Sequence, residues 1–580
     1  MSRTIRTLLA FIGAFGAAGA QASLHERIFR YGFDPAPDAP ATQAEAARFL
    51  TQATFGPKQS DLRRLMALGY DAWLEEQLGM APTLGQPAVE QVVNARTAAG
   101  QSISQMQRLQ RWYWQAAYAP DQLRQRMAWA LSQIFVISDQ NSSIGGNIVP
   151  MAGYYDMLAR DAFKPYRTLL GDVTLHPMMG RYLSTFRNQK PSATTSPDEN
   201  YAREVMQLFS VGLVLREMDF SPVLSGGVEI PTYDQTTITH TAKVFTGFTW
   251  SDAPTAPPNF NGGGSTFAAQ SAPMACWGTE LFPASGSGSN NMRHDVTGDD
   301  GTTATPKTII GGVPIPPNQT CAQDVGDALD IIAAHPNVAP FISRQLIQRF
   351  VTSNPSPAYI ERVATVFDAS NGDLGDVLKA ILMDDEARHP PPLSAGDSYG
   401  KLREPILRLT ALWRAFDAQP QPPDAYGEVK MTAGNSLTAQ FGQGPLQAPT
   451  VFNFYDPDYQ QPGPLADAGR YSPELQIVSE ASTYTSGNYY YNFSARAYIG
   501  MTNPPTDRPL LDLSPLTADA THPAGMVATI DGRLLYGTMS PAMRATLTSM
   551  LANLNGASAN DKAWSALYVT LLSPEFATQR

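Results

Sequence analysis

One continuous stretch, Ser196-Pro197-Asp198-Glu199-Asn200-Tyr201-Ala202-Arg203-Glu204-Val205-Met206-Gln207-Leu208-Phe209, carries the strongest structural signal in the sequence. Its opening residues predict the start of a helix. Ser196 can cap the free amides, Pro197 suits the first helical position, and Glu199 completes a capping box three residues after the cap. We call the predicted element the signature helix.

The signature helix has two chemically different faces. At about 100° per residue, one arc gathers the polar side chains, which are Glu199, Asn200, Arg203, Glu204 and Gln207. The other side carries Tyr201, Ala202, Val205, Met206, Leu208 and Phe209. We therefore expect the helix to dock by its apolar face. Its polar face, with two carboxylates and a guanidinium, meets either solvent or a pocket.

The same stretch resembles the signature of a large bacterial family of exported, uncharacterised proteins, the domain of unknown function family 1800. The resemblance rests on Glu-Asn-Tyr-Ala-Arg-Glu and Met-Gln-Leu-Phe-Ser-Val-Gly between Glu199 and Gly212, and on short segments at residues 48–50 and 54–57. It extends from about Ala46 to the C-terminus. Genes of this family often neighbour those of secreted sulfatase-like proteins. The resemblance therefore implies a surface or polymer pathway, with a polysaccharide or a secreted sulfatase-like protein as partner.

Length and composition indicate a large globular protein outside the nucleic-acid-binding classes. The chain has 580 residues, enough for a sizeable core, and a hydrophobic content of 43%. Charged residues make up only 16%, whereas 45 glycines and 47 prolines suggest long ordered loops. A net charge of −11 without a basic cluster argues against a nucleic-acid surface.

The N-terminus predicts export. Arg3 and Arg6 precede an apolar run at residues 8–20, and Ala20-Gln21-Ala22 matches a small-x-small cleavage site. We expect a signal peptide at residues 1–22, an extended proline-rich leader at 23–41, and a periplasmic or secreted mature protein. No later segment has the apolar length of a membrane span.

Two cysteines, Cys276 and Cys321, are present. In an exported protein an even pair usually forms a disulfide. Two thiolate metal ligands are the alternative, but the local Cys-x-x-Cys spacing of such sites is missing. The sequence therefore favours a disulfide bond.

The remaining periodicity predicts a mainly α fold, one large multi-helix domain with a loop-rich insertion. We expect an N-terminal helical half at residues 42–250, the insertion at 251–320, and a C-terminal helical half of the same domain at 321–580. Four predicted helices begin after a capping side chain, at Thr42, Asp234, Asn337 and Asp373. Within the insertion, residues 307–312 suit a short strand or hairpin.

The first candidate site lies on the signature helix. Glu199 and Glu204 beside Arg203 are suited to an acid/base pair, or to hard-metal ligands with the guanidinium orienting a substrate anion. The structural alternative is that Glu199 belongs to the capping box and pairs with Arg203 one turn on. The match to the family signature supports both interpretations.

The second candidate site is the dipeptide His294-Asp295, followed by Lys307. The resemblance includes a similar His-Asp and Lys-Thr pattern. A His-Asp pair can orient an imidazole for proton transfer or bind a metal, and polar loop residues are often functional. The alternative is a solvated loop with a local hydrogen bond between His294 and Asp295.

These candidates leave two functions open. The first is an exported enzyme that acts on an extracellular or periplasmic polymer, a polysaccharide or its anionic decorations, with Glu199, Arg203, Glu204, His294 and Asp295 as catalytic residues. The second is a non-catalytic periplasmic or cell-surface binding or assembly factor. The second is favoured by the absence of zincin, nucleophile-elbow, phosphate-loop and dinucleotide motifs. The identity of any metal or cofactor stays open.

Overall fold

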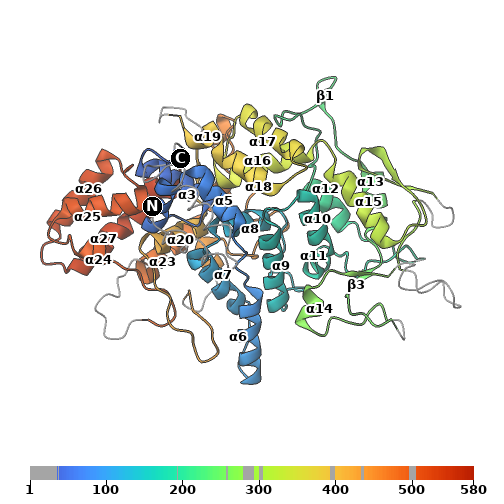
Figure 1. Ribbon diagram of the computed structural model, residues 1–580, viewed down its shortest axis with the longest axis horizontal. Helices are drawn as coiled ribbons and strands as arrows, with labels where there is room; N and C mark the ends of the chain where they lie inside the picture. The colour runs from blue at the N-terminus through green and yellow to red at the C-terminus, as the bar shows by residue number, and fades with distance from the viewer. Residues whose placement is uncertain are drawn as a thin grey trace, which may run out of the picture.

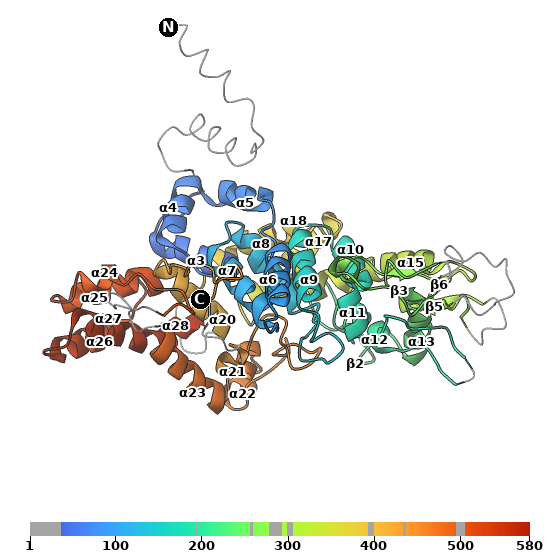
Figure 2. The same ribbon diagram turned by 90° about the horizontal axis from the view of Figure 1, so that it is seen from below.

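The computed structural model describes residues 36, 38–192, 194–255, 259–277, 293–298, 305–391, 399–432, 437–494 and 505–580. The signal peptide predicted at residues 1–22 and most of the predicted leader lie outside these ranges. The described chain is mainly α-helical, as predicted, and its strands form two-stranded antiparallel pairs. Figures 1 and 2 show an elongated arrangement with α24–α27 at one end and α13 and α15 at the other.

The helices of the first part of the chain lie between residues 43 and 244. They are α3 (Gln43–Ala53), α4 (Gln59–Leu68), α5 (Tyr70–Gly79), α6 (Gln86–Ala98), α7 (Met106–Tyr118), α8 (Gln122–Ser132), α9 (Ile148–Asp161), α10 (Tyr166–Leu175), α11 (Pro177–Tyr182), α12 (Asn200–Gln207) and α13 (Gln235–Val244).

Short strands gather between α12 and α15. They are β1 (Leu224–Ser225), β2 (Val228–Glu229), β3 (Phe248–Thr249), β4 (Ala275–Cys276), β5 (Lys307–Ile309) and β6 (Val313–Ile315), with α14 (Phe267–Ser271) and η1 (Ile310–Gly312) beside them. They pair as β1–β2, β3–β4 and β5–β6, each in sequence order. The hairpin predicted at residues 307–312 is therefore confirmed, with η1 as its turn.

The second helical part follows. Its elements are α15 (Cys321–Ala333), α16 (Val338–Phe350), α17 (Pro357–Ala369), α18 (Leu374–Met383), α19 (Asp385–Arg388), β7 (Lys401–Leu402), α20 (Pro405–Ala415), α21 (Thr438–Phe441), α22 (Pro464–Asp467), η2 (Pro473–Ile477), α23 (Glu480–Tyr489), η3 (Tyr490–Ser494), α24 (Ser514–Thr517), α25 (Pro523–Ile530), η4 (Asp531–Leu535), α26 (Pro541–Asn553), α27 (Ala559–Leu571), α28 (Pro574–Ala577) and β8 (Thr578–Gln579). Strand β8 pairs with β7, so residues near the C-terminus lie beside residues 401–402.

Local capping chemistry explains several helix starts. The side chains of Thr42, Asp234 and Asp373 accept hydrogen bonds from amides in the first turns of α3, α13 and α18, as predicted. The predicted cap at Asn337 is wrong. That residue has helical dihedral angles, and its side chain bonds a different segment of the chain, residues 211–216.

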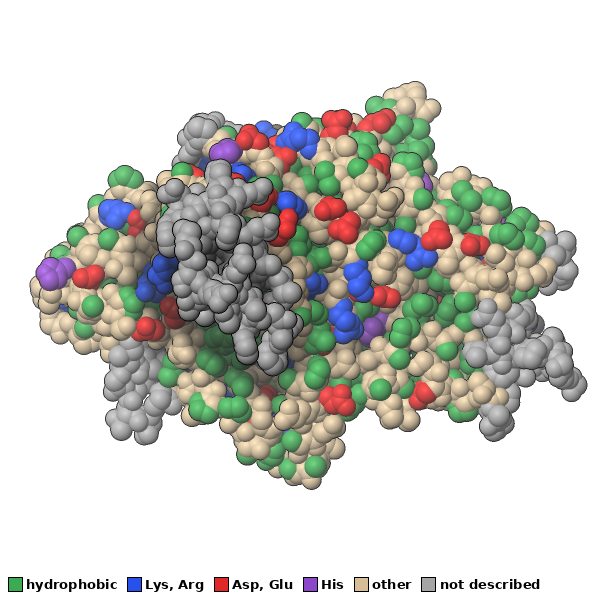
Figure 3. All heavy atoms as spheres, viewed as in Figure 1, with side chains coloured by type: hydrophobic (Ala, Val, Ile, Leu, Met, Phe, Trp, Pro, Cys, Tyr) green, Lys and Arg blue, Asp and Glu red, His purple; other side chains and the backbone are tan. Residues whose placement is uncertain are grey.

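One hydrophobic core runs through both helical parts, from Ala46 in α3 to Phe576 in α28. A small second cluster lies between α6 and α9 and includes Val89, Val93 and Val149. Figure 3 shows acidic and basic side chains interspersed among hydrophobic and uncharged ones on one face. Among the residues that the structure describes, none of the helices combines the length and apolar character needed to cross a membrane.

Candidate functional site

The signature helix begins later than predicted. Helix α12 starts at Asn200, and Ser196 makes no cap, so the predicted capping box is wrong. Asn188 holds Asp198, two residues before the helix, through both backbone groups, with N···O distances of 2.9 and 3.2 Å. The Asp198 carboxylate then accepts the Asn200 amide at 2.9 Å. The chain is therefore fixed in a non-helical course up to Glu199.

The two faces of α12 are as predicted. Tyr201, Val205 and Met206 are buried in the core. Glu199 pairs with Arg203 at 3.4 Å, and their side chains are 34% and 41% exposed. The Glu199 carboxylate also accepts hydrogen bonds from two side chains of α13, Gln235 Nε2 at 2.9 Å and Thr239 Oγ1 at 3.0 Å. Glu199 therefore joins α12 to α13 at the protein surface.

Glu204 lies in a different environment one turn further on. Its side chain is half-buried, and its Oε2 atom is buried without a hydrogen-bond partner in the described structure. Burial raises the pKa of this carboxyl, while Arg203 acts in the opposite direction. The negative charge of Glu204 in turn contributes to the raised pKa of Tyr182 and of Tyr233. Glu204 is thus the predicted site residue with a perturbed protonation equilibrium.

His294 is fully buried, not in a solvated loop. Its Nε2 atom lies 2.9 Å from Asp324 Oδ2 in the first turns of α15, and its Nδ1 atom lies 3.0 Å from the carbonyl oxygen of Thr246. Lys307 Nζ reaches the same Asp324 oxygen at 2.5 Å, and this lysine and aspartate are also fully buried. His294, Asp324 and Lys307 form a buried triad of polar side chains.

Asp295 does not serve as the partner of the imidazole. Its Oδ1 atom accepts the Thr297 amide at 3.2 Å, and its Oδ2 atom lies 3.9 Å from Lys243 Nζ. Its own amide donates to Thr246 Oγ1 at 2.9 Å. The histidine and aspartate that are adjacent in sequence therefore make separate sets of contacts, and the aspartate that binds His294 is Asp324.

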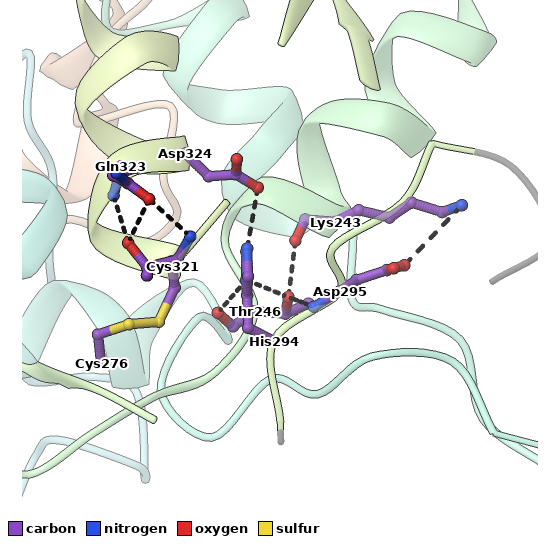
Figure 4. The surroundings of a disulfide bond; sticks show 9 residues. Lys243, Thr246, Cys276, His294, Asp295, Cys321, Gln323 and Asp324 are labelled. Atoms are coloured by element: carbon purple, nitrogen blue, oxygen red, sulfur yellow. Dashed lines mark hydrogen bonds and ion pairs between the residues drawn. A yellow bond between two sulfur atoms is a disulfide. The ribbon is translucent and has the colours of Figure 1, made fainter. Parts of the chain in front are cut away.

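The predicted disulfide is confirmed and lies near His294 and Asp324 of the triad (Figure 4). It joins Cys276 of β4 to Cys321, the first residue of α15, with a Cα–Cα distance of 5.9 Å. Asp324 follows Cys321 by one helical turn. The disulfide and the triad therefore fasten the loop-rich insertion to the same end of α15.

The structure does not bring the two predicted sets together. Within the described ranges, no hydrogen bond or ion pair connects Glu199, Arg203 or Glu204 with His294 or Asp295. Helix α13 lies between the sets, since it contacts both α12 and β5. The described residues also contain no cluster of three or more histidine, cysteine and acidic side chains that is suited to a metal ion.

A cavity that the sequence did not reveal lies at the end of the signature stretch. This space, cavity A, has a volume of about 490 Å³. Its walls come from residues 207–216, from the 341–349 face of α16, from residues 451–459, and from Gln133 and Ile134. Two further cavities share lining residues with it in turn. Cavity B, about 790 Å³, shares Phe220 and Arg344 with cavity A, and cavity C, about 470 Å³, shares Tyr471 with cavity B.

We call cavities A, B and C together the groove. Aromatic rings and guanidinium groups stack where its parts meet. Arg344 lies over the ring of Phe220 at 4.6 Å and over that of Tyr471 at 4.9 Å, and it pairs with Asp458 at 2.5 Å. The guanidinium group of Arg216 also lies over the ring of Phe220, at 4.6 Å. Such cation–π stacks hold planar groups in fixed positions along the groove.

One wall of cavity A is anchored by Asn337. Its Nδ2 atom donates to the carbonyl oxygens of Val211 at 2.9 Å and Val214 at 2.7 Å, and its Oδ1 atom accepts the Arg216 amide at 3.0 Å. The side chain that was predicted to cap α16 therefore fixes the loop that follows the signature helix.

Charged side chains lie buried around Arg349, which lines cavity A, and two of them, Lys401 and Glu474, line cavity C. Arg349 of α16 donates to the carbonyl oxygens of Gln345 and Gln133, and Arg126 and Lys401 both donate to the carbonyl oxygen of Arg349. Lys401 also pairs with Glu474 at 2.8 Å. One oxygen of the buried Glu404 carboxylate accepts from three neutral donors, which are Trp129 Nε1, Gln133 Nε2 and Gln443 Nε2.

Two residues of cavity A have backbone conformations that side chains rarely adopt. Phe220 has a φ angle of 70° and Asn453 one of 68°. Residues held in this region cost conformational energy and concentrate at ligand-binding sites. Both residues line cavity A, and Phe220 also lines cavity B.

Comparison with known proteins places the chain in a family. The model of the family described as protein of unknown function (DUF1800) matches residues 48–578. The chain belongs to this family. No curated protein and no solved structure matches it.

In this DUF1800 protein, the stretch that carries the family resemblance connects the two features described above. It begins at Glu199 on the outer face of α12 and ends at Gly212, which lines cavity A together with Gln207, Leu208 and Val211. The predicted site residues of this stretch lie outside the linings of cavities A, B and C. The sequence signal that could have located cavity A was therefore the end of the signature stretch. The residue types there do not by themselves indicate a binding site.

Proposed function

We propose that this protein is exported to the periplasm or beyond and binds an extended polymer there, a polysaccharide, along the groove. The carrying observation is the connection of three cavities in a row through shared aromatic and arginine residues. A chain of sugar rings needs several adjoining subsites, whereas a compact ligand needs one cavity.

The lining suits sugar rings. The faces of a pyranose ring carry C–H groups that pack on aromatic rings, and its edges carry hydroxyl groups that bond amides and charged side chains. Tyr471 and the half-exposed Phe452 supply rings, while Arg344 and Asn354 supply donors. The groove therefore offers both kinds of contact along its length.

Two observations support the compartment. The disulfide between Cys276 and Cys321 fits an oxidising environment. The N-terminal sequence, with Arg3 and Arg6 before an apolar run, predicts a signal peptide. The family resemblance adds a secreted sulfatase-like protein as a second proposed partner, in the same polymer pathway.

Binding without catalysis is the function that the geometry supports best, because the predicted catalytic residues do not line the groove. An enzyme acting on the same polymer is the second candidate. It is favoured by the raised pKa of the Glu204 carboxyl, which burial shifts in the direction expected for a proton donor. Release of oligosaccharides from polymer, measured for wild type and for Glu204→Gln, tests this candidate.

Calorimetric titration with oligosaccharides of graded length tests the binding proposal. We expect affinity to rise with chain length until the groove is filled. Tyr471→Ala removes a ring shared by cavities B and C and should weaken binding about tenfold. Tyr484→Ala removes an exposed ring on α23, away from these linings, and is the matched control. Equal affinities of the two variants would contradict the proposal.

A further inference from the structure

We propose that cavity A binds an oxyanion carried by the polymer, the carboxylate of an acidic sugar or a sulfate ester, against Arg349, Gln345 and Asn453. This inference rests on the proposed polymer binding and adds a chemical class of ligand to one part of the groove. The two sources share the same chemistry, a negatively charged group whose oxygen atoms accept several hydrogen bonds.

The buried charges around Arg349, which lines cavity A, do not balance. Three cations, Arg126, Arg349 and Lys401, face two carboxylates, Glu404 and Glu474, and all five side chains are more than nine-tenths buried. Glu474 is taken by Lys401 at 2.8 Å. Glu404 therefore remains as the carboxylate that acts on both arginines, and it forms an ion pair with neither.

Burying an uncompensated charge is costly, so an excess cation in a protein interior calls for a partner. The carboxylates that Arg349 senses, Glu404 and Glu474, act on it from a distance. An anion in cavity A would lie against Arg349 directly, because this residue lines the cavity. The charge of the ligand would then complete the balance of the buried network.

Unused hydrogen-bonding atoms belong to residues that line the same cavity. Arg349 Nε, Gln345 Nε2 and both polar atoms of the Asn453 side chain have no hydrogen-bond partner in the described part of the chain. The three residues are 3%, 5% and 6% exposed, and all three line cavity A. Leaving a buried donor unpaired is costly, and a ligand oxygen that reached these N–H groups would remove that cost.

Asn453 adds a second sign of a ligand site. Its φ angle of 68° is tolerated by asparagine better than by most residues, usually because the amide bonds the local backbone. Here neither amide atom makes such a bond. The Asn453 side chain therefore lies at the wall of cavity A with neither amide atom bonded within the described residues.

The charge of the lining separates cavity A from cavity B. Cavity A is lined by three arginines and two aspartates, which are Arg216, Arg344, Arg349, Asp456 and Asp458. Cavity B is lined by three arginines and three acidic residues, which are Arg216, Arg344, Arg470, Asp219, Glu386 and Asp458. A neutral sugar chain suits cavity B, whereas the excess of positive charge places the anionic group in cavity A.

Two substitutions remove donors from cavity A with little cost to the fold. Asn453→Gly keeps the positive φ angle, which glycine adopts readily, and Gln345→Met keeps the side-chain volume. Asn371→Gly is the matched control, since Asn371 also has a positive φ angle, 54°, but lies in the turn between α17 and α18. Thermal unfolding of each variant without ligand verifies folding.

The probes are a uronic-acid oligosaccharide, a sulfated oligosaccharide and a neutral oligosaccharide of the same length, with D-glucuronate and inorganic sulfate as free anions. We expect one acidic oligosaccharide to bind the wild type at least tenfold more tightly than the neutral one. We expect Asn453→Gly and Gln345→Met to abolish this preference, and Asn371→Gly to retain it. The preferred acidic probe identifies the carboxylate or the sulfate ester as the ligand.

The outcomes separate the two proposals. If acidic and neutral oligosaccharides bind equally and Asn453→Gly changes neither affinity, the anion site is wrong and polymer binding stands. If free glucuronate or sulfate binds, is lost in Asn453→Gly, and no oligosaccharide binds, the anion site stands and polymer binding is wrong. If none of the five probes binds the folded wild type, both proposals are overturned.

Discussion

The Nε2 atom of His294 lies 2.9 Å from the Oδ2 atom of Asp324 in the fully buried interior, where Lys307 shares the same oxygen. Removing the aspartate charge would leave the Lys307 cation buried without its carboxylate partner and would weaken the hydrogen bond to His294. We therefore expect Asp324→Asn to lower the free energy of unfolding by about 3–5 kcal/mol, measured by denaturant unfolding.

Asp330→Asn is the control for this prediction. Asp330 lies on the same helix, α15, and pairs with Arg167 at 2.6 Å, but its side chain is 69% exposed. We expect its substitution to cost less than about 1 kcal/mol. Equal stabilities of Asp324→Asn and Asp330→Asn would show that the triad is not a stabilising unit.

Glu204 should make the stability of the protein depend on pH. A carboxyl whose pKa is raised on folding binds its proton more tightly in the folded protein, so its contribution to stability falls as the pH rises from its ordinary pKa through the raised one. Glu204→Gln stays neutral throughout. We expect it to raise Tm at pH 7 by on the order of 1 °C, a small change because the group is half-exposed, and to have less effect at pH 4.

Thermal unfolding at the two pH values measures this difference. Glu199→Gln serves as the comparison on the same helix. Because the Glu199 carboxylate pairs with Arg203 and accepts from Gln235 and Thr239, its substitution should lower Tm at pH 7. A lower Tm at pH 7 for Glu204→Gln as well would mean that the Glu204 charge stabilises the helix.

Asn337 should matter for both stability and binding. Asn337→Ala leaves two carbonyl oxygens and one amide of residues 211–216 without their partner, at a cost of about 1–3 kcal/mol. Hydrogen exchange should show faster opening of this loop, and the affinity for the oligosaccharide should fall. Asn553→Ala removes one hydrogen bond at the exposed end of α26 and should change neither property. Unchanged exchange in Asn337→Ala would contradict the anchoring role.

The disulfide should stabilise the junction between the insertion and α15. Cys276 and Cys321 are 45 residues apart, and closing a loop of this length contributes about 2–4 kcal/mol in the chain-entropy model. We expect the Cys276→Ser/Cys321→Ser double variant to unfold at lower denaturant concentration than the oxidised wild type. A reductant should affect the wild type alone, and a wild type that unfolds at the same midpoint with and without reductant would refute the prediction.

Helix starts were predictable from the sequence where the capping side chain met no competition. Thr42, Asp234 and Asp373 cap their own helices because the signal acts within three residues of chain. At Ser196 the same signal failed, since Asn188 bonds both backbone groups of Asp198 and delays the helix. Asn337 failed for a related reason, as its side chain bonds residues far away in sequence.

The candidate site was less predictable than the fold. The sequence identified His294 and Lys307, and it placed Asp295 beside the imidazole by adjacency. The partner is instead Asp324, whose position in the first turns of α15 carried no chemical signal. Cavity A was hidden for the same reason, because Arg349 and Asn453 acquire their environments only from tertiary packing.

The hydrogen bond from Tyr455 to Gln133 in the wall of cavity A spans 322 residues of chain. Contacts of such length are slow to form, because the entropy of closing the intervening loop is lost first. Cavity A is therefore expected to be among the last features to appear during folding, and no fragment lacking either partner would contain it. A ligand of cavity A would bind the folded chain and not the unfolded one. It would therefore shift the folding equilibrium toward the folded state, and proteolysis and turnover of the entire protein would slow.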